Sequence, residues 1–116
     1  MKTIKLKDWD KTPQDYTGIV EWEGGNKGWY KNGNFHREDG PAYVGKAFVG
    51  ISSYKVWRLD GKFIWSSNYK HDLRNEILLS KDQHPKYPTV QVWKILDKDK
   101  IYEQIMIPGM EEFIKK

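Results

Sequence analysis

The stretch that decides the fold is Gly28-Trp29-Tyr30-Lys31-Asn32-Gly33-Asn34-Phe35, and its pattern recurs at residues 56–63 as Val-Trp-Arg-Leu-Asp-Gly-Lys-Phe. Each copy places a polar dipeptide between two short segments that carry aromatic and aliphatic side chains. Asn-Gly and Asp-Gly are the preferred two-residue loops of β-hairpins, because a type I′ turn needs positive φ at both positions. The sequence therefore predicts two hairpins that turn at residues 32–33 and 60–61.

A two-residue loop also sets the register of each hairpin, and alternate residues of a strand share one face of the sheet. In both hairpins this register puts aromatic side chains on both faces. We therefore expect a sheet with one aromatic-rich face packed and the other partly open. The expected cross-strand pairs are Trp29 with His36, Tyr30 with Phe35, Trp57 with Ile64 and Arg58 with Phe63.

The rest of the chain predicts further strands and little helix. A looser third copy of the hairpin pattern covers residues 92–101, and the apolar residues around it alternate as in half-buried strands. Residues 69–80 fit a short helix or a strand, whereas Pro85 and Pro88 exclude regular structure at residues 84–88. A terminal helical turn is expected at residues 110–116. The expected strands cover residues 18–23, 42–44, 48–51, 89–96 and 100–107.

The length and composition are typical of one compact domain. The chain has 116 residues, and six Trp, seven Tyr and four Phe allow a few large side chains to form the core. We predict that residues 1–116 form a single domain of the mainly β class, in which hairpin repeats at about 18–65 build an antiparallel sheet. A C-terminal hairpin at about 84–116 and minor helix, including a short C-terminal one, complete it. Trp57 and Trp93, which have apolar neighbours, are expected in the core.

Charge and cysteine content narrow the classes of partner. The formal net charge is +4, but the Lys and Arg residues are dispersed, so nucleic acid is a partner that we do not favour. The chain has no Cys and therefore no disulfides and no thiolate metal ligands. Neither a signal peptide nor the roughly 20 apolar residues of a membrane span are present in the sequence. We expect a cytoplasmic protein without a membrane partner, and the oligomeric state stays open.

The first hairpin continues into the motif His36-Arg37-Glu38-Asp39-Gly40-Pro41-Ala42. Its central part is typical of a turn, since Asp and Gly accept turn geometry and proline stands at the edge or start of a strand. Residues 29–42 as a whole resemble the repeat WYxNGxxHRxDGPA, found in tandem in small uncharacterised proteins of bacteriophages and large DNA viruses. These repeats look like MORN-type hairpins. Only one full copy is present here, because the second hairpin continues with Ile-Trp-Ser-Ser at residues 64–67.

The resemblance implies a phage-encoded protein of β-hairpins that acts in the host cytoplasm, and it implies no catalytic residues. We expect a non-enzymatic binding protein that engages a host protein or a small ligand through an aromatic sheet face. Antagonism of a host defence system is one concrete form of this function. One alternative is a structural or virion-associated protein. The other is a small nucleotide-processing or nucleic-acid-acting enzyme that uses His36, Arg37 and Asp39.

These three residues are candidates for acid-base chemistry because they combine an imidazole with a carboxylate and a guanidinium. We favour a structural hairpin corner instead, in which Arg37 pairs with a carboxylate and His36 packs on Trp29. The tandem repetition of the string in similar proteins favours this structural role further. The three histidines lack the spacing of metal ligands, so no metal and no cofactor is expected. Trp and Tyr are enriched at binding hot spots. The expected binding residues are Trp22, Trp29, Tyr30, His36, Arg37, Asp39, Arg58 and Trp65.

Overall fold

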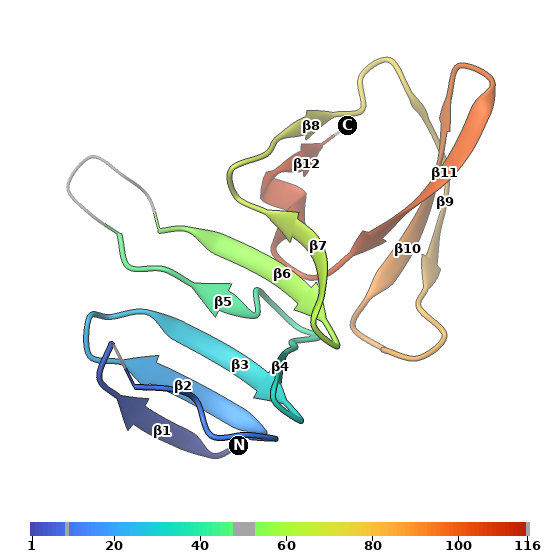
Figure 1. Ribbon diagram of the computed structural model, residues 1–116. Coiled ribbons are helices and arrows are strands. Elements are labelled where there is room, and N and C mark those ends of the chain that lie inside the picture. Colours follow the sequence, from blue (N-terminus) through green and yellow to red (C-terminus); the bar gives the residue numbers. More distant parts are fainter. Residues whose placement is uncertain (9, 48–52, 116) are drawn as a thin grey trace. The chain divides into compact units, whose positions relative to one another are not determined.

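The computed structural model describes residues 1–8, 10–47 and 53–115, and its fold is mainly β, as predicted (Figure 1). The chain divides into two compact units. The first comprises Met1–Arg37 and Pro41–Asn68, and the second comprises Glu38–Gly40 and Tyr69–Lys116. Among the described residues, no helix is long and apolar enough to cross a membrane.

The first unit is built around one sheet with the strand order β1-β2-β3-β5-β6-β7, in which β4 pairs with β3. β1 and β2 run parallel, and the other pairs are antiparallel. The strands are β1 (Thr3–Leu6), β2 (Gly18–Trp22), β3 (Lys27–Lys31), β4 (Asn34–Phe35), β5 (Tyr43–Val44), β6 (Lys55–Leu59) and β7 (Lys62–Ser66). The strands expected at residues 18–23 and 42–44 are confirmed with slightly shorter bounds, and the one expected at residues 48–51 lies outside the described residues.

Both predicted hairpin turns are confirmed. Asn32 and Gly33 have φ values of 51° and 82°, and Asp60 and Gly61 have φ values of 50° and 81°. Positive φ at both central positions is the geometry of a type I′ turn, whose twist matches that of the strands on either side. The local choice of Asn-Gly and Asp-Gly thus accounts for where β3 turns into β4 and β6 turns into β7.

The predicted register of the two hairpins is only partly correct. Tyr30 pairs with Phe35 as expected. In the second hairpin Arg58 pairs with Phe63, but Trp57 pairs with Trp65 and not with Ile64. The register shifts between Trp57 and Arg58, so Ile64 is the extra residue of a β-bulge. The expected pair of Trp57 with Ile64 is therefore wrong, because a bulge breaks the simple alternation that a two-residue loop would impose.

The second unit contains a three-stranded antiparallel sheet, β11-β10-β9, and a short parallel pair, β12-β8. Its elements are β8 (His71–Asp72), β9 (Ile77–Gln83), β10 (Gln91–Asp97), β11 (Lys100–Met106), the 3-10 helix η1 (Met110–Glu112) and β12 (Ile114–Lys115). Within residues 69–80 the structure has strands and no helix. The helical turn expected at 110–116 is confirmed only for η1, because the residues that follow pair with β8.

Each unit has its own set of fully enclosed apolar side chains. Trp57 and Trp93 are 0% and 6% exposed, as their apolar neighbours predict. The most enclosed apolar residues of the first unit are Val20, Ala42 and Trp57, and those of the second are Leu73, Val90, Ile95, Ile107, Met110 and Ile114. The aromatic side chains described next are not among them.

Candidate ligand-binding site

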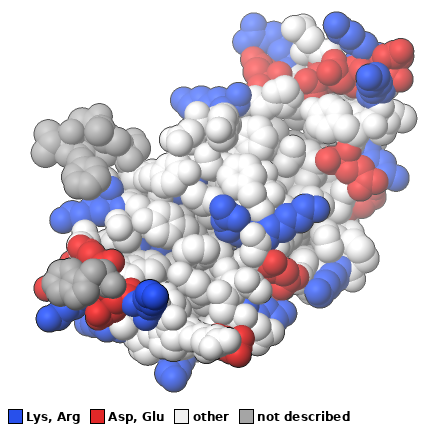
Figure 2. Space-filling view, viewed as in Figure 1, with Lys and Arg blue, Asp and Glu red and all other residues white. Residues whose placement is uncertain are grey.

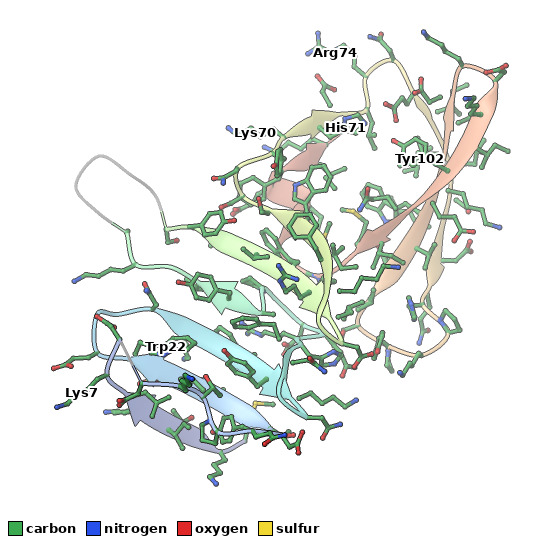
Figure 3. All side chains as sticks on the ribbon, viewed as in Figure 1. Lys7, Trp22, Lys70, His71, Arg74 and Tyr102 are labelled. Atoms are coloured by element: carbon green, nitrogen blue, oxygen red, sulfur yellow. The ribbon has the colours of Figure 1, made fainter. Side chains whose placement is uncertain are left out.

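Four aromatic side chains lie on one face of the first sheet, and two strand pairings explain the position of three of them. Gly28 and Tyr30 are two positions apart on β3, so they point to the same face. Tyr30 pairs with Phe35, and Gly28 pairs with Tyr43. Because residues that pair directly across strands share a face, Phe35 and Tyr43 lie beside Tyr30. Trp22 joins them from β2, where Figure 3 labels it.

The four rings contact one another in a closed circuit. The centroids of Tyr30 and Phe35 are 4.5 Å apart in a stacked arrangement, and those of Phe35 and Tyr43 are 5.8 Å apart. Trp22 closes the circuit at 6.3 Å from Tyr43 and 6.4 Å from Tyr30. These separations lie in the range in which aromatic pairs attract each other. We refer to Trp22, Tyr30, Phe35 and Tyr43 as the aromatic ring cluster.

Gly28 forms the floor under this cluster. A Cβ atom at this position would lie 2.8 Å from Phe35 Cε1 and 3.2 Å from the indole of Trp22. Glycine is therefore needed here for close approach, since a side chain would push the rings away from the sheet.

A cavity of about 300 Å³ opens at the cluster. Its size is at the lower end of small-molecule sites. The four rings are only half-buried, so parts of them are accessible from solvent. The lining residues are Asp8, Trp22, Asn26, Tyr30, Phe35 and Tyr43.

Among the described residues, Asp8 supplies the one charged side chain of the lining. Its Oδ1 accepts a hydrogen bond from the backbone N–H of Gly24 at 2.9 Å. A Cβ atom on Gly24 would lie 2.7 Å from Asp8 Oδ2, so the carboxylate rests directly against the glycine backbone. The carboxylate is therefore positioned by the turn between β2 and β3.

The surroundings of Tyr43 change the pKa of its phenol. Burial raises the pKa of Tyr43 above its usual value of 10.0, and the neighbouring Tyr30, Tyr54 and Asp8 raise the pKa further. Tyr43 therefore stays neutral across the physiological pH range. Asn26 Oδ1 accepts the backbone N–H of Lys46 at 2.8 Å. Within the described lining, the cavity thus combines neutral rings with the negative charge of Asp8.

Of the residues predicted from sequence, Trp22 and Tyr30 belong to the cavity. Trp29 does not, since it lies next to Tyr30 on β3 and therefore points to the opposite face. There the guanidinium of Arg37 lies 4.0 Å from the centre of the Trp29 ring, and Arg37 Nη1 donates a hydrogen bond to the Pro41 carbonyl at 3.2 Å.

His36 is 7% exposed, and its Nδ1 accepts a hydrogen bond from the backbone N–H of Asp60 at 2.8 Å. This contact agrees with the structural interpretation of the motif. Asp39 is exposed and belongs to the second unit, whereas His36 belongs to the first.

The remaining predicted residues lie in the second hairpin. The guanidinium of Arg58 lies 5.7 Å from the Phe63 ring centre, and its Nη1 donates to the Gly61 carbonyl at 3.0 Å. Trp65 is half-buried opposite Trp57.

Sequence reasoning missed Asp8, Asn26, Phe35 and Tyr43 as lining residues. Phe35 could have been found, because the predicted register already placed it opposite Tyr30. Asp8 and Asn26 carry no local signal, since they reach the cavity only through the pairing of β1 with β2 and the turn after β2.

The second unit holds a polar cluster that the sequence did not reveal. Glu76 Oε1 lies 2.9 Å from His71 Nε2, and Glu76 Oε2 accepts a hydrogen bond from the Tyr102 hydroxyl at 2.5 Å. Figure 3 labels His71 on β8 and Tyr102 on β11. Burial raises the pKa of Tyr102 above its usual value, and Glu76 raises it further. Because both carboxylate oxygens of Glu76 are engaged, the cluster connects the segment after β8 to β11.

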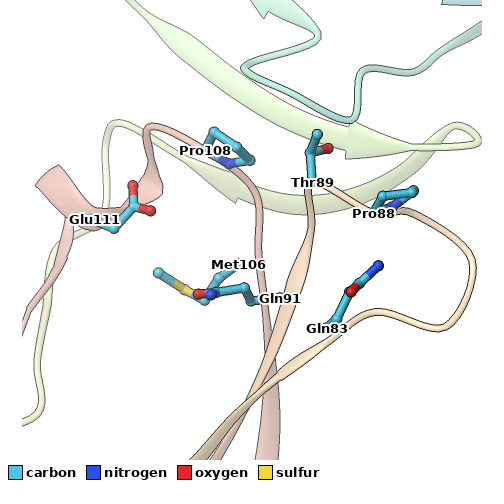
Figure 4. A pocket seen from close by; sticks show the side chains of 7 residues that line it. All are labelled: Gln83, Pro88, Thr89, Gln91, Met106, Pro108 and Glu111. Carbon is cyan, nitrogen blue, oxygen red and sulfur yellow. The ribbon is translucent and has the colours of Figure 1, made fainter.

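A cavity of about 330 Å³ also opens in the second unit (Figure 4). Three polar side chains of its lining are bonded within the chain. Thr89 Oγ1 donates to the Glu38 carbonyl, and Glu111 Oε2 accepts the N–H of Gly109. Gln91 Oε1 accepts Nε1–H of Trp93. These bonds favour a structural role for the lining.

Within the described part of the chain, no three His, Asp or Glu side chains are grouped so that they could hold a metal ion. Comparison of the chain with protein-family models, curated proteins and solved structures finds no match.

Proposed function

We propose that the protein is a non-enzymatic binding protein, and that the aromatic ring cluster is its binding surface. The observation that supports this proposal is the cavity at the closed circuit of Trp22, Tyr30, Phe35 and Tyr43. Half-exposed Trp and Tyr side chains provide large contact areas at a small cost in side-chain entropy, which is why they are frequent at binding hot spots.

The chemistry of the lining favours binding over catalysis. A general base or nucleophile would need a titratable group whose free atom reaches the reacting centre. Asp8 already uses one oxygen for Gly24, and Tyr43 holds its proton. A single carboxylate beside neutral rings and an amide lacks the second titratable group of an acid–base pair, so we propose that it positions a ligand.

The alternative enzyme would use His36, Arg37 and Asp39. His36 Nδ1 serves as the acceptor for the backbone of a neighbouring turn. Arg37 stacks on Trp29. Both side chains thus have a structural use, and we do not propose the enzymatic alternative.

The charge distribution favours a protein or small-molecule ligand over nucleic acid. On the face drawn in Figure 2, Lys and Arg side chains are interspersed with Asp and Glu side chains. Phosphate backbones bind best where positive side chains are concentrated. In line with the resemblance to phage proteins, we propose that the ligand is a host protein or a small host molecule in the cytoplasm, and that antagonism of a host defence is one form of this activity.

The test is a comparison of three forms of the tagged protein in pull-downs from bacterial lysate, with mass spectrometry of captured proteins and extracted metabolites. Trp22→Ala is expected to lose the ligand that the unchanged protein captures. Phe63→Ala removes an exposed ring of the same sheet, 46% exposed and outside the cavity, and is expected to keep the ligand. If Trp22→Ala captures the same molecules while Phe63→Ala does not, the cluster is not the binding surface.

A further inference from the structure

The walls of the cavity have the electronic character that attracts cations. The face of an aromatic ring carries partial negative charge, and a cation within about 6 Å of a ring centre is attracted to it. The four rings of the cluster line one cavity of about 300 Å³. A group placed there would meet several rings at once.

The charge of the lining has the matching sign. Asp8 is negative, and the cavity is lined by no Lys or Arg among the described residues. Asp8 Oδ2 has no hydrogen-bond partner among the described residues, since the bond from the N–H of Gly24 goes to Oδ1. The carboxylate also raises the pKa of Tyr43.

The chain stacks its own cations on other rings of the same unit. Lys27 Nζ lies 5.1 Å from the Trp29 ring centre, Lys2 Nζ lies 5.6 Å from the Tyr16 ring centre, and Arg58 lies over Phe63. No such cation lies over the ring cluster among the described residues. The cluster thus has the chemistry of the other stacking sites but no occupant from this part of the chain.

The kind of cation follows from the number of hydrogen-bond acceptors. A primary ammonium has three N–H donors that need partners when it leaves water. Besides the Asp8 carboxylate, the described lining offers Asn26 Oδ1, which already accepts the N–H of Lys46, and the weaker phenol oxygens of Tyr30 and Tyr43. An alkylated ammonium has few or no N–H groups, and its methyl groups fit against aromatic faces.

We propose that the aromatic ring cluster, with Asp8 at its edge, binds an alkylated ammonium group. This inference rests on the proposed binding function and names the chemistry of the ligand. The group could be the head of a small molecule or a methylated lysine side chain, because the recognised chemistry is the same in both.

The test uses choline and its neutral carbon isostere, 3,3-dimethylbutan-1-ol, in NMR titrations of the whole chain. Choline is expected to shift the indole N–H resonance of Trp22 in a saturable manner. The isostere has the same shape but no charge, so it is expected to bind at least about 5-fold more weakly, as loss of one modest cation–π contribution predicts. Equal or tighter binding of the isostere would overturn the proposal, and so would the absence of saturable binding of choline.

Variants separate the contribution of the charge from that of the rings. Asp8→Asn keeps the size of the side chain and is expected to weaken choline binding by about 3-fold, the scale of a solvent-exposed charge pair. Gly24→Ala keeps every lining residue but displaces the carboxylate, and is expected to act in the same direction. Phe63→Leu is expected to leave the affinity unchanged. Unchanged affinity in both Asp8→Asn and Gly24→Ala would contradict the role of the carboxylate.

Two further arms identify the source of the group. A trimethyllysine peptide is compared with the same peptide carrying unmodified lysine, and both are compared with choline. Tighter binding of the trimethylated peptide identifies a protein ligand, whereas tighter binding of choline identifies a small molecule, and either supports the proposal. If both choline and the isostere bind equally and Trp22→Leu abolishes both, the cation chemistry is wrong while the binding surface stands. If none binds, the cation proposal fails, and the pull-down with Trp22→Ala decides the proposed function independently.

Discussion

The imidazole of His36 accepts a hydrogen bond through Nδ1 from the backbone N–H of Asp60, at 2.8 Å. This contact joins the end of the first hairpin to the turn of the second. The next donor of the same turn, the N–H of Gly61, bonds to the Phe35 carbonyl at 2.8 Å. The motif that resembles viral hairpin repeats therefore supplies two acceptors to the turn of the following hairpin.

The turn of the first hairpin is held in the same way by the segment before it. The N–H of Asn32 donates to Thr17 Oγ1 at 2.9 Å, and the N–H of Gly33 donates to the Tyr16 carbonyl at 2.9 Å. In both turns the N–H of the first turn residue donates to a side-chain atom, and the N–H of the second donates to a backbone carbonyl. Each of these hairpin turns is thus held by the segment that precedes its hairpin in the chain.

Replacement of His36 by Ala is expected to lower the free energy of unfolding by about 1 to 3 kcal/mol, because the N–H of Asp60 loses its acceptor in a poorly hydrated place. Urea denaturation measures the change. His84→Ala is the control, since His84 Nδ1 accepts the N–H of Lys86 and its ring lies 5.0 Å from that of Tyr87, both contacts within its own loop. If the two variants lose the same free energy of unfolding, the contact between the hairpins does not stabilise the protein more than a bond within one loop does.

Gly33→Val tests the type I′ turn. With φ at 82°, a β-branched residue at this position is expected to lower the free energy of unfolding by roughly 1 to 3 kcal/mol. Asn32→Gly is the matched change at the neighbouring turn position, where φ is also positive, and is expected to cost little or nothing. The assignment of the turn fails if Gly33→Val has an unchanged melting temperature.

Gly28→Ala tests the floor of the aromatic ring cluster. The added Cβ would lie 2.8 Å from Phe35 Cε1, so we expect displaced rings, a changed near-UV circular dichroism spectrum and weaker ligand binding. Gly45→Ala is the control, because its Cβ would meet Tyr54 Cβ at an ordinary 3.4 Å. Identical spectra for the two variants would contradict the close packing on Gly28.

Tyr102 is expected to make the free energy of unfolding depend on pH in the alkaline range. Burial and the bonded Glu76 raise its pKa in the folded protein above the value of 10.0 that it has when unfolded. Above pH 10, ionisation of this phenol therefore lowers the free energy of the unfolded chain, whereas the phenol of the folded protein stays neutral. The stabilisation is present below pH 10 and is lost progressively as the pH rises toward the folded pKa.

The measurement is the melting temperature of the protein and of Tyr102→Phe between pH 7 and pH 11.5. At pH 7 the variant is expected to be less stable by about 1 kcal/mol, the typical worth of one hydrogen bond. Above pH 10 the two curves are expected to converge, because only the protein with Tyr102 loses this contribution. Parallel curves over the whole range would argue against a buried neutral phenol.

Some residues of the candidate site could be predicted from local sequence, whereas others depend on contacts between distant parts of the chain. Tyr30 and Phe35 could be placed together from sequence, since a two-residue loop determines the partners on either side of it. Trp22 could be named as a binding residue but not joined to Tyr30, because that requires the pairing of β2 with β3. Asp8 could not be found at all, since its place depends on the bond to Gly24 sixteen positions further along the chain.

By itself the sequence determined the mainly β class and the positions of the two tight turns. Asn32-Gly33 and Asp60-Gly61 act through the steric limits on their own backbone, which do not depend on the rest of the fold. Only the tertiary structure decided the bulge at Ile64 and the strand His71–Asp72, which pairs with Ile114–Lys115. These features depend on contacts between residues distant in sequence, and local preference is too weak to determine them where such contacts compete with it.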